Sequence, residues 1–266
     1  MPQALPLIAR PDLASEVSAV ERDGYVYLPA VLDPEQTAEL RAHMDRLQPN
    51  PDSFDRGLAP ERDGFVNRHI NNAFNRDPYF VQFLDYPGVI EIAEALHGAN
   101  CHVIGMTSWQ TGPGRPDQTL HADWQPLELP EDVMADPRVR IPVYISTAHF
   151  YLDDMTEELG PTRFVPGSHR AGRAPNGDTA WQGREEQSIL CNAGDVVMFR
   201  SEVWHRGTAN HSDRVRHLLQ VHYAQRWIAQ RFPPYLHRFR FDPDTLAIAS
   251  NRQRRLMGDH PPGNYD

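Results

Sequence analysis

The sequence has little of what marks several common classes of protein. Only two cysteines occur, Cys101 and Cys191, and no Cys-x-x-Cys motif is present, so neither a zinc ribbon nor a disulfide scaffold is supported. No apolar run approaches the roughly 18 residues that a membrane helix needs. The N-terminus lacks the basic start and long apolar core of a signal peptide. We therefore expect a cytoplasmic protein with reduced thiols and no membrane association.

An excess of positive charge is also missing. The formal net charge is −10, which argues against a nucleic-acid partner, because a surface that binds nucleic acid needs clustered positive charge. Hydrophobic residues make up 40% and charged residues 23% of the chain, as in ordinary globular proteins rather than disordered ones. At 266 residues the chain can bury a full core, and we expect a single domain.

Helical patterns come first along the chain, and extended patterns follow. Asp33 as N-cap, Pro34 in the first turn and Gln36 three residues after the cap predict a helix start. The segment 48–63 is polar and carries proline, so it is either a simple connection or a lid. This order is typical of an α+β domain whose helices cover one face of a β-sandwich or barrel. The predicted helices are 12–21, 34–47 and 89–96, and the predicted strands are 25–28, 101–109, 143–152, 195–199 and 215–227.

Three His-x-Asp motifs are present, and only one has a context that suits a metal site. With 13 histidines in the chain, chance alone gives about one such motif. The copy at His43 lies in a predicted helix, where residues two apart point to different sides. The copy at His211 lies among turn-forming residues, which indicates a surface loop. The middle copy, His121-Ala122-Asp123, lies in an extended segment, so both side chains project to one side and can reach one metal.

A second histidine is needed to complete a ligand set of the kind that holds Fe(II) on one face and leaves other positions open. We prefer His205, because it lies just beyond the predicted strand that follows Gly194, and site residues are often placed at strand ends. A buried, hydrogen-bonded role remains the expectation for the others. The candidates downstream of the first pair are His149, His169, His205, His217 and His222.

Several segments together resemble the phytanoyl-CoA dioxygenase family, from about residue 15 to the C-terminus. They are Gln118 to Asp123, Leu152 to His169, Gly194 to His205, and Arg255 to Pro262. The resemblance implies a double-stranded β-helix, or jelly roll, with helices about 10–98 on one face, the core about 99–230 and a tail 231–266. It also implies Fe(II), 2-oxoglutarate and O2 as cofactor and cosubstrates, with His121, Asp123 and His205 as metal ligands.

A dicarboxylate buried beside iron needs a cation at its far end, and an arginine can bind a carboxylate through two hydrogen bonds. Arg214 and Arg216 are both candidates, and strand alternation does not separate them. The family places its arginine eleven residues after the distal histidine, which selects Arg216. By the same resemblance, Gln118 and Thr162 contact 2-oxoglutarate, whereas His169 belongs to a structural turn.

The resemblance implies hydroxylation of an unactivated C–H bond in a small metabolite or biosynthetic intermediate, with release of succinate and CO2. Desaturation, epoxidation or cyclisation stays open, as does a cupin-type isomerase or dioxygenase that does not use 2-oxoglutarate, or an inactive binding protein. Chlorination is disfavoured, because related halogenases lack the carboxylate that Asp123 supplies. Asn67 and Trp124 are candidates for the substrate pocket. The protein is expected to be a monomer or a homodimer.

Overall fold

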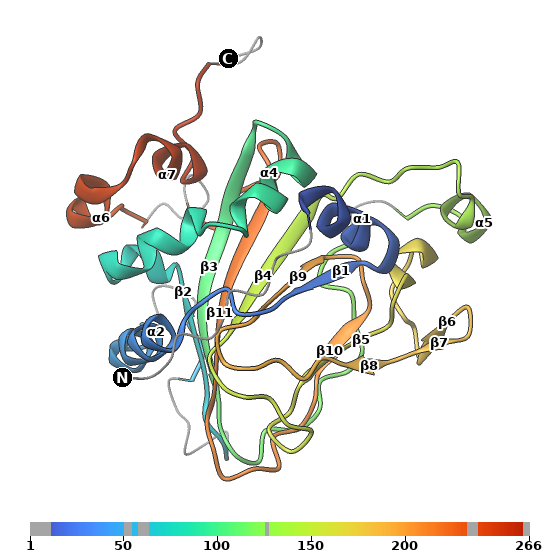
Figure 1. The fold of residues 1–266 in the computed structure, drawn as a ribbon, viewed down its shortest axis with the longest axis horizontal. Helices are drawn as coiled ribbons and strands as arrows, with labels where there is room; N and C mark the ends of the chain where they lie inside the picture. The colour runs from blue at the N-terminus through green and yellow to red at the C-terminus, as the bar shows by residue number, and fades with distance from the viewer. Residues whose placement is uncertain (1–11, 51–54, 58–63, 126–127, 233–238, 263–266) are drawn as a thin grey trace.

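The centre of the molecule is a six-stranded antiparallel sheet in a computed structural model that describes residues 12–50, 55–57, 64–125, 128–232 and 239–262 (Figure 1). All of its neighbouring strands run antiparallel. In spatial order the strands are β1 (Tyr25–Leu28), β9 (Val196–Arg200), β4 (Ile145–Tyr151), β11 (Arg216–Gln225), β3 (Cys101–Thr111) and β2 (Asn67–Asn71).

A second, smaller sheet packs on one face of the first. It consists of β10 (His205–Gly207), β5 (Thr162–Phe164) and β8 (Gln187–Ser188) in that order. Aromatic contacts join the two layers, for example Phe164 and Phe199, whose ring centroids are 5.1 Å apart. A short hairpin of β6 (Ala180–Trp181) and β7 (Arg184–Glu185) extends beyond it, and α5 (Glu131–Ala135) and η4 (Ser168–Ala171) lie on the same side (Figure 1).

Helices cover the opposite face of the large sheet (Figure 1). The capping box predicted for α2 is present, with the Asp33 side chain accepting from the Gln36 backbone N–H and the Gln36 side chain accepting in return. Leu40 and Met44 of this helix are fully buried in the main apolar core. The helices are α1 (Leu13–Asp23), α2 (Pro34–Arg46), η2 (Ala73–Asn75), η3 (Pro78–Asp85), α4 (Ile90–His97), α6 (Pro243–Ile248) and α7 (Asn251–Leu256).

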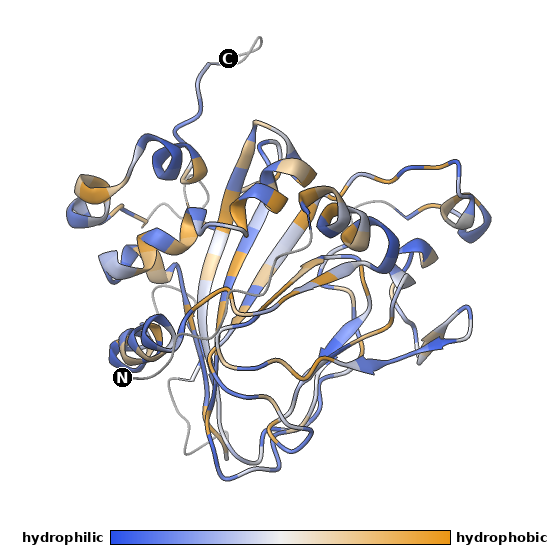
Figure 2. Ribbon diagram, in the orientation of Figure 1, coloured by the Kyte–Doolittle hydropathy of each residue, from blue (hydrophilic) through white to orange (hydrophobic). Residues whose placement is uncertain are grey.

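Strand alternation divides β11 between two environments. Leu219, Val221 and Tyr223 point into the core beneath the helices, and Arg216, Gln220 and His222 line a cavity between the two sheets. Figure 2 shows apolar residues running along the strands and the inner faces of the helices, and hydrophilic residues on the β6–β7 hairpin. The strand that supports the core thus also presents the polar groups of the candidate site.

The predicted fold class is confirmed, since helices cover one face of a jelly roll that is built from antiparallel sheets (Figure 1). The predicted helices and main strands all appear, with ends that shift by a few residues. The segment predicted as a C-terminal tail, 231–266, contains α6 and α7. Ion pairs from Arg252 and Arg255 to Glu94 attach α7 to α4. Most of the segment 48–63, for which a connection and a lid are both open, lies outside the described residues, at 51–54 and 58–63. None of the helices described is long and apolar enough to cross a membrane.

Candidate metal centre and active-site cavity

His121, Asp123 and His205 converge at one end of the space between the sheets. The Nε2 of His121 lies 3.6 Å from Asp123 Oδ1, and the Nε2 of His205 lies 3.7 Å from Asp123 Oδ2. One potential ligand atom from each residue lies within 4.8 Å of the others. Asp123 is fixed by its backbone N–H, which donates to the Ser201 carbonyl at 2.9 Å. The structure thus brings together the three residues that the sequence predicts as ligands.

The backbone determines which nitrogen of each histidine is available to a metal. Nδ1 of His121 lies 2.7 Å from the Thr119 carbonyl, and Nδ1 of His205 lies 2.9 Å from the Val203 carbonyl. Because a carbonyl only accepts, each Nδ1 must carry the hydrogen, and each Nε2 keeps its lone pair. Histidine ligands are usually oriented by such contacts. Two neutral imidazoles and one carboxylate are a donor set that fits Fe(II).

Arg216 lies buried in the same cavity, at 2% exposure. Its Nε donates to Thr111 Oγ1 at 3.1 Å, and its Nη1 donates to the Gly160 carbonyl. No carboxylate forms an ion pair with this guanidinium in the part of the chain that the structure describes. Burial lowers the pKa of Arg216, and a buried charge without a counter-ion is costly. An anionic ligand would remove that cost.

Thr162 and Gln118 add hydrogen-bond donors beside Arg216. The Tyr151 hydroxyl donates to Thr162 Oγ1 at 2.8 Å, which leaves the Thr162 hydroxyl hydrogen available to another acceptor. Gln118 Oε1 accepts from the Gly207 backbone N–H at 2.8 Å, so the Gln118 amide nitrogen remains a donor. All three side chains line one cavity of about 300 Å³ with the metal triad. This set of donors complements a carboxylate.

Comparison with known proteins identifies the family. The model of the phytanoyl-CoA dioxygenase (PhyH) family matches residues 20–218. The chain belongs to the phytanoyl-CoA dioxygenase family. It is therefore an Fe(II)- and 2-oxoglutarate-dependent dioxygenase that uses O2 as cosubstrate. The alternative of a cupin-type enzyme that does not use 2-oxoglutarate is set aside by this finding.

Relatives and solved structures agree with this family. The dioxygenase trt7 of Aspergillus terreus is 26% identical over 249 residues, which cover 90% of this chain and 81% of trt7. The Fe(II)/2-oxoglutarate-dependent dioxygenase nvfF of Aspergillus novofumigatus is 29% identical over 220 residues, covering 76% and 67%. The crystal structure of SnoN, a non-heme alpha ketoglutarate dependent epimerase from nogalamycin biosynthesis, superposes with a TM-score of 0.65 at 21% identity, covering 84% of this chain and 86% of SnoN. That likeness shows the fold.

Charges in this dioxygenase suit the binding of a cation by the triad. Burial alone would raise the pKa of the Asp123 carboxyl, but His205 and His121 hold it well below its usual range. Burial lowers the pKa of His205, whereas the interaction with Asp123 raises that of His121. Asp123 is therefore ionised at neutral pH, and His205 is neutral. Both are the states that a metal ligand needs.

Further histidines line the cavity of the dioxygenase and were not predicted as site residues. His149 Nε2 lies 3.0 Å from Gln220 Nε2, and burial lowers the pKa of His149 to about 3. His222 neighbours Gln220 on the same face of β11. Arg216, Gln220 and His222 are separated by even numbers of residues in the predicted strand, which places their side chains on one face. This pattern could have identified Gln220 and His222 as cavity residues. Trp109, His69, Arg56 and Arg231 complete the walls.

An outer cavity of about 390 Å³ adjoins the inner one, and the two share Asp123, His222 and Arg231. Trp124, a predicted pocket residue, lines this outer cavity. Asn67, the other predicted pocket residue, is not part of either wall. Its Oδ1 accepts from Trp109 Nε1 at 2.8 Å and thereby orients that ring.

Arg214 lies exposed before β11 begins and contacts the Asp154 carbonyl. His169 is buried against the Glu21 carbonyl, at 3.1 Å.

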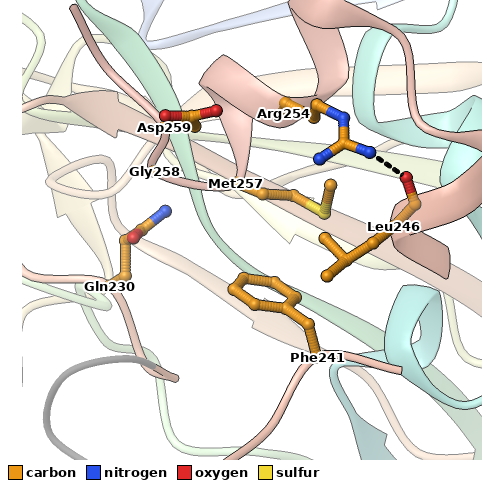
Figure 3. Close-up of a pocket in the computed structure, with 7 residues that line it drawn as sticks. All are labelled: Gln230, Phe241, Leu246, Arg254, Met257, Gly258 and Asp259. Carbon is orange, nitrogen blue, oxygen red and sulfur yellow. Dashed lines mark hydrogen bonds between the residues drawn. The ribbon is translucent and has the colours of Figure 1, made fainter. Parts of the chain in front are cut away.

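A separate cavity of about 400 Å³ lies beside the C-terminal helices (Figure 3). It shares no lining residue with the two cavities at the metal triad. Figure 3 shows Arg254 donating to the Leu246 carbonyl across its edge. Its walls are formed by Gln230, Phe241, Leu246, Arg254, Met257, Gly258 and Asp259.

Proposed function

We propose that this dioxygenase hydroxylates an unactivated C–H bond of a small organic molecule. The balanced reaction consumes one 2-oxoglutarate and one O2 and yields one hydroxylated product, one succinate and one CO2. The observation that carries the proposal is the position of Arg216. It is a buried guanidinium without a carboxylate partner in the described chain, and it lies in one cavity with His121, Asp123 and His205.

In this proposal one group of residues holds the metal and another binds the cosubstrate. His121, Asp123 and His205 hold Fe(II), while Arg216, Thr162 and Gln118 bind 2-oxoglutarate through the donors that they present to the cavity. Iron, once bound, supplies the redox chemistry that couples decarboxylation of 2-oxoglutarate to cleavage of the C–H bond. Trp109 lies beneath Arg216, with its ring centroid 5.8 Å from the guanidinium carbon, and restricts how the far carboxylate can lie.

The outer cavity is the proposed binding place of the organic substrate. It opens onto Asp123 and His222, so a substrate lying there would have a C–H bond next to the metal position. Such positioning accounts for much of the rate that an enzyme gains. Ile104, Ile145 and Ile228 form an apolar part of its wall.

The reaction is tested in two steps. First, the purified protein is incubated with Fe(II), 2-oxoglutarate and O2, and succinate is measured. We expect succinate from the wild type and none from Asp123→Ala. Second, once a substrate is available, turnover under oxygen-18 gas separates the outcomes that insert oxygen from those that do not. Hydroxylation and epoxidation add a labelled oxygen, whereas desaturation, cyclisation and the epimerisation named for SnoN do not.

A further inference from the structure

Arg231 connects the two cavities of the candidate active site. Its side chain lines both the inner and the outer cavity. Its backbone N–H donates to the Ile104 carbonyl at 2.8 Å, which fixes the segment against β3. Its Cδ lies 3.5 Å from the position that a Cβ at Gly105 would take, and Gly105 pairs with His222. Arg231 therefore lies against β3 at Gly105, where it lines both cavities together with Asp123.

Among the residues that the structure describes, the guanidinium groups of Arg231 and of Arg56, another wall residue, have no partner. Neither forms a side-chain hydrogen bond or an ion pair with any described residue. Asp123 is the carboxylate whose charge acts on Arg231. It would be a ligand of a bound metal and would then no longer serve as a counter-ion for Arg231. Arg206, by contrast, is paired with Glu186 and Asp117. Arg231 and Arg56 are both exposed, but they line one cavity. In a protein of net charge −10, two such arginines form a local positive site that suits an anionic ligand.

His69 shows that the two arginines act on the same part of the cavity. The backbones of Arg56 and His69 form a two-way bridge, with N–H to carbonyl distances of 2.9 and 3.2 Å. Burial, followed by the charges of Arg56 and Arg231, lowers the pKa of His69 to about 4. His69 is thus neutral at pH 7, and the local positive field comes from the arginines.

The outer cavity has an apolar side as well. Trp124 is 36% exposed and Trp227 is 62% exposed, and both line this cavity. Tyr144 lies between them, with ring centroids 6.2 Å from Trp124 and 5.6 Å from Trp227, both edge to face. Large exposed aromatic rings at a cavity mouth are typical of a surface that binds an apolar ring or chain.

We propose, on the basis of the hydroxylase function above, that the substrate is an amphipathic oxyanion. Its carboxylate or phosphate binds Arg231 and Arg56, and its apolar body lies against Trp124 and Trp227, whose rings Tyr144 contacts. Arginine suits either oxyanion, because its planar donors match two oxygens at once. Arg216 is not available to this group, because it binds the cosubstrate. The arginines therefore select the charged end of the substrate, and the aromatic rings select its body.

Matched probes test the proposal without knowledge of the natural substrate. Equilibrium dialysis under argon measures binding of 2-naphthoate, 2-naphthyl phosphate and 2-naphthol to the protein saturated with Fe(II) and 2-oxoglutarate, so that Arg216 and the metal are already occupied. We expect the better anion to bind roughly tenfold or more tightly than the neutral naphthol. The carboxylate and the phosphate arms show which oxyanion the site prefers.

The variants are Arg231→Gln, Arg56→Gln and, as control, Arg138→Gln, whose side chain is 88% exposed and pairs with Asp136. Arg231→Gln should abolish most of the anion preference and leave naphthol binding unchanged, Arg56→Gln should reduce it, and the control should keep it. Equal binding of the three probes by the wild type, or an anion preference that survives in Arg231→Gln, would overturn the proposal. The visible absorption of the Fe(II)–2-oxoglutarate complex reports separately on the metal and cosubstrate site that the hydroxylase function requires, because the band does not depend on a substrate.

Discussion

His121 and His205 face each other in an isolated antiparallel bridge, in which the backbone N–H of each donates to the carbonyl of the other, at 3.0 and 2.8 Å. Their rings lie with centroids 4.6 Å apart. The bridge brings together two segments that are distant in the sequence, and it does so through main-chain atoms alone. Replacing one imidazole should therefore remove a ligand without removing the contact that positions the other.

Arg216 and Arg214 form a matched pair for testing the 2-oxoglutarate site. Arg216→Gln should raise the KM for 2-oxoglutarate roughly tenfold to a hundredfold, because a charge-assisted hydrogen bond to a carboxylate contributes about 1.5–3 kcal/mol. Arg214→Gln should leave it unchanged, since that side chain is exposed before β11. Succinate formation as a function of 2-oxoglutarate concentration measures both. Equal effects of the two substitutions would remove Arg216 from the site.

Tyr151 is expected to act on the cosubstrate through Thr162. Its hydroxyl donates to Thr162 Oγ1, so Tyr151→Phe leaves the threonine hydroxyl free to rotate away from the cavity. The Kd for 2-oxoglutarate should rise roughly fivefold, as expected for one neutral hydrogen bond. Thr162→Val should have a similar effect, and the double variant should add little to either, because both substitutions break one chain of bonds. Fully additive effects would show that the two residues act independently.

His97 is expected to make the stability of the fold depend on pH. It is buried at the end of α4, with Nε2 2.7 Å from Ser146 Oγ. Burial lowers its pKa to about 3, against about 6.5 in an unfolded chain. Above pH 6.5 neither state is protonated. As the pH falls from 6.5 toward 3, the His97 imidazole becomes protonated in the unfolded chain but stays neutral in the folded chain. The free energy of unfolding therefore falls.

Urea unfolding at pH 7, 6 and 5 measures this effect against His97→Gln. Between pH 6 and 5 the wild type should lose up to about 1.4 kcal/mol more stability than the variant. Other buried histidines contribute to both proteins and cancel in the difference. If the free energies of unfolding of the wild type and of His97→Gln changed with pH in parallel, His97 would not be the buried neutral histidine that makes stability depend on pH.

Local patterns allowed much of the fold to be predicted. The capping box at Asp33, the helix that follows it and the four long strands all depend on residues close together in sequence. The short strands β5, β8 and β10 could not be predicted in the same way, because each has only two or three residues and exists through pairing with distant partners. The same holds for α6 and α7, whose packing depends on Glu94 and other distant side chains.

For the site, the choice among the three His-x-Asp motifs depended on local conformation alone. In the structure His43 and Asp45 of the first motif diverge, since His43 contacts Asp77 and Asp45 contacts Gln110. The helix thus directs the two side chains to different partners, as the spacing of two residues in a helix predicts. The cavity walls were harder to predict, because β2, β3, β4 and β11 must first be in register before His69, His149 and His222 face one space.

The central claim, that His121, Asp123 and His205 hold Fe(II) together with 2-oxoglutarate, is tested most directly by an anaerobic visible-absorption titration of the protein with Fe(II) and then 2-oxoglutarate. The wild type should develop a charge-transfer band that needs both additions. His205→Ala should lack it, and His211→Ala, which alters an exposed histidine, should retain it. Iron binding without a band in the wild type, or an undiminished band in His205→Ala, would contradict the account.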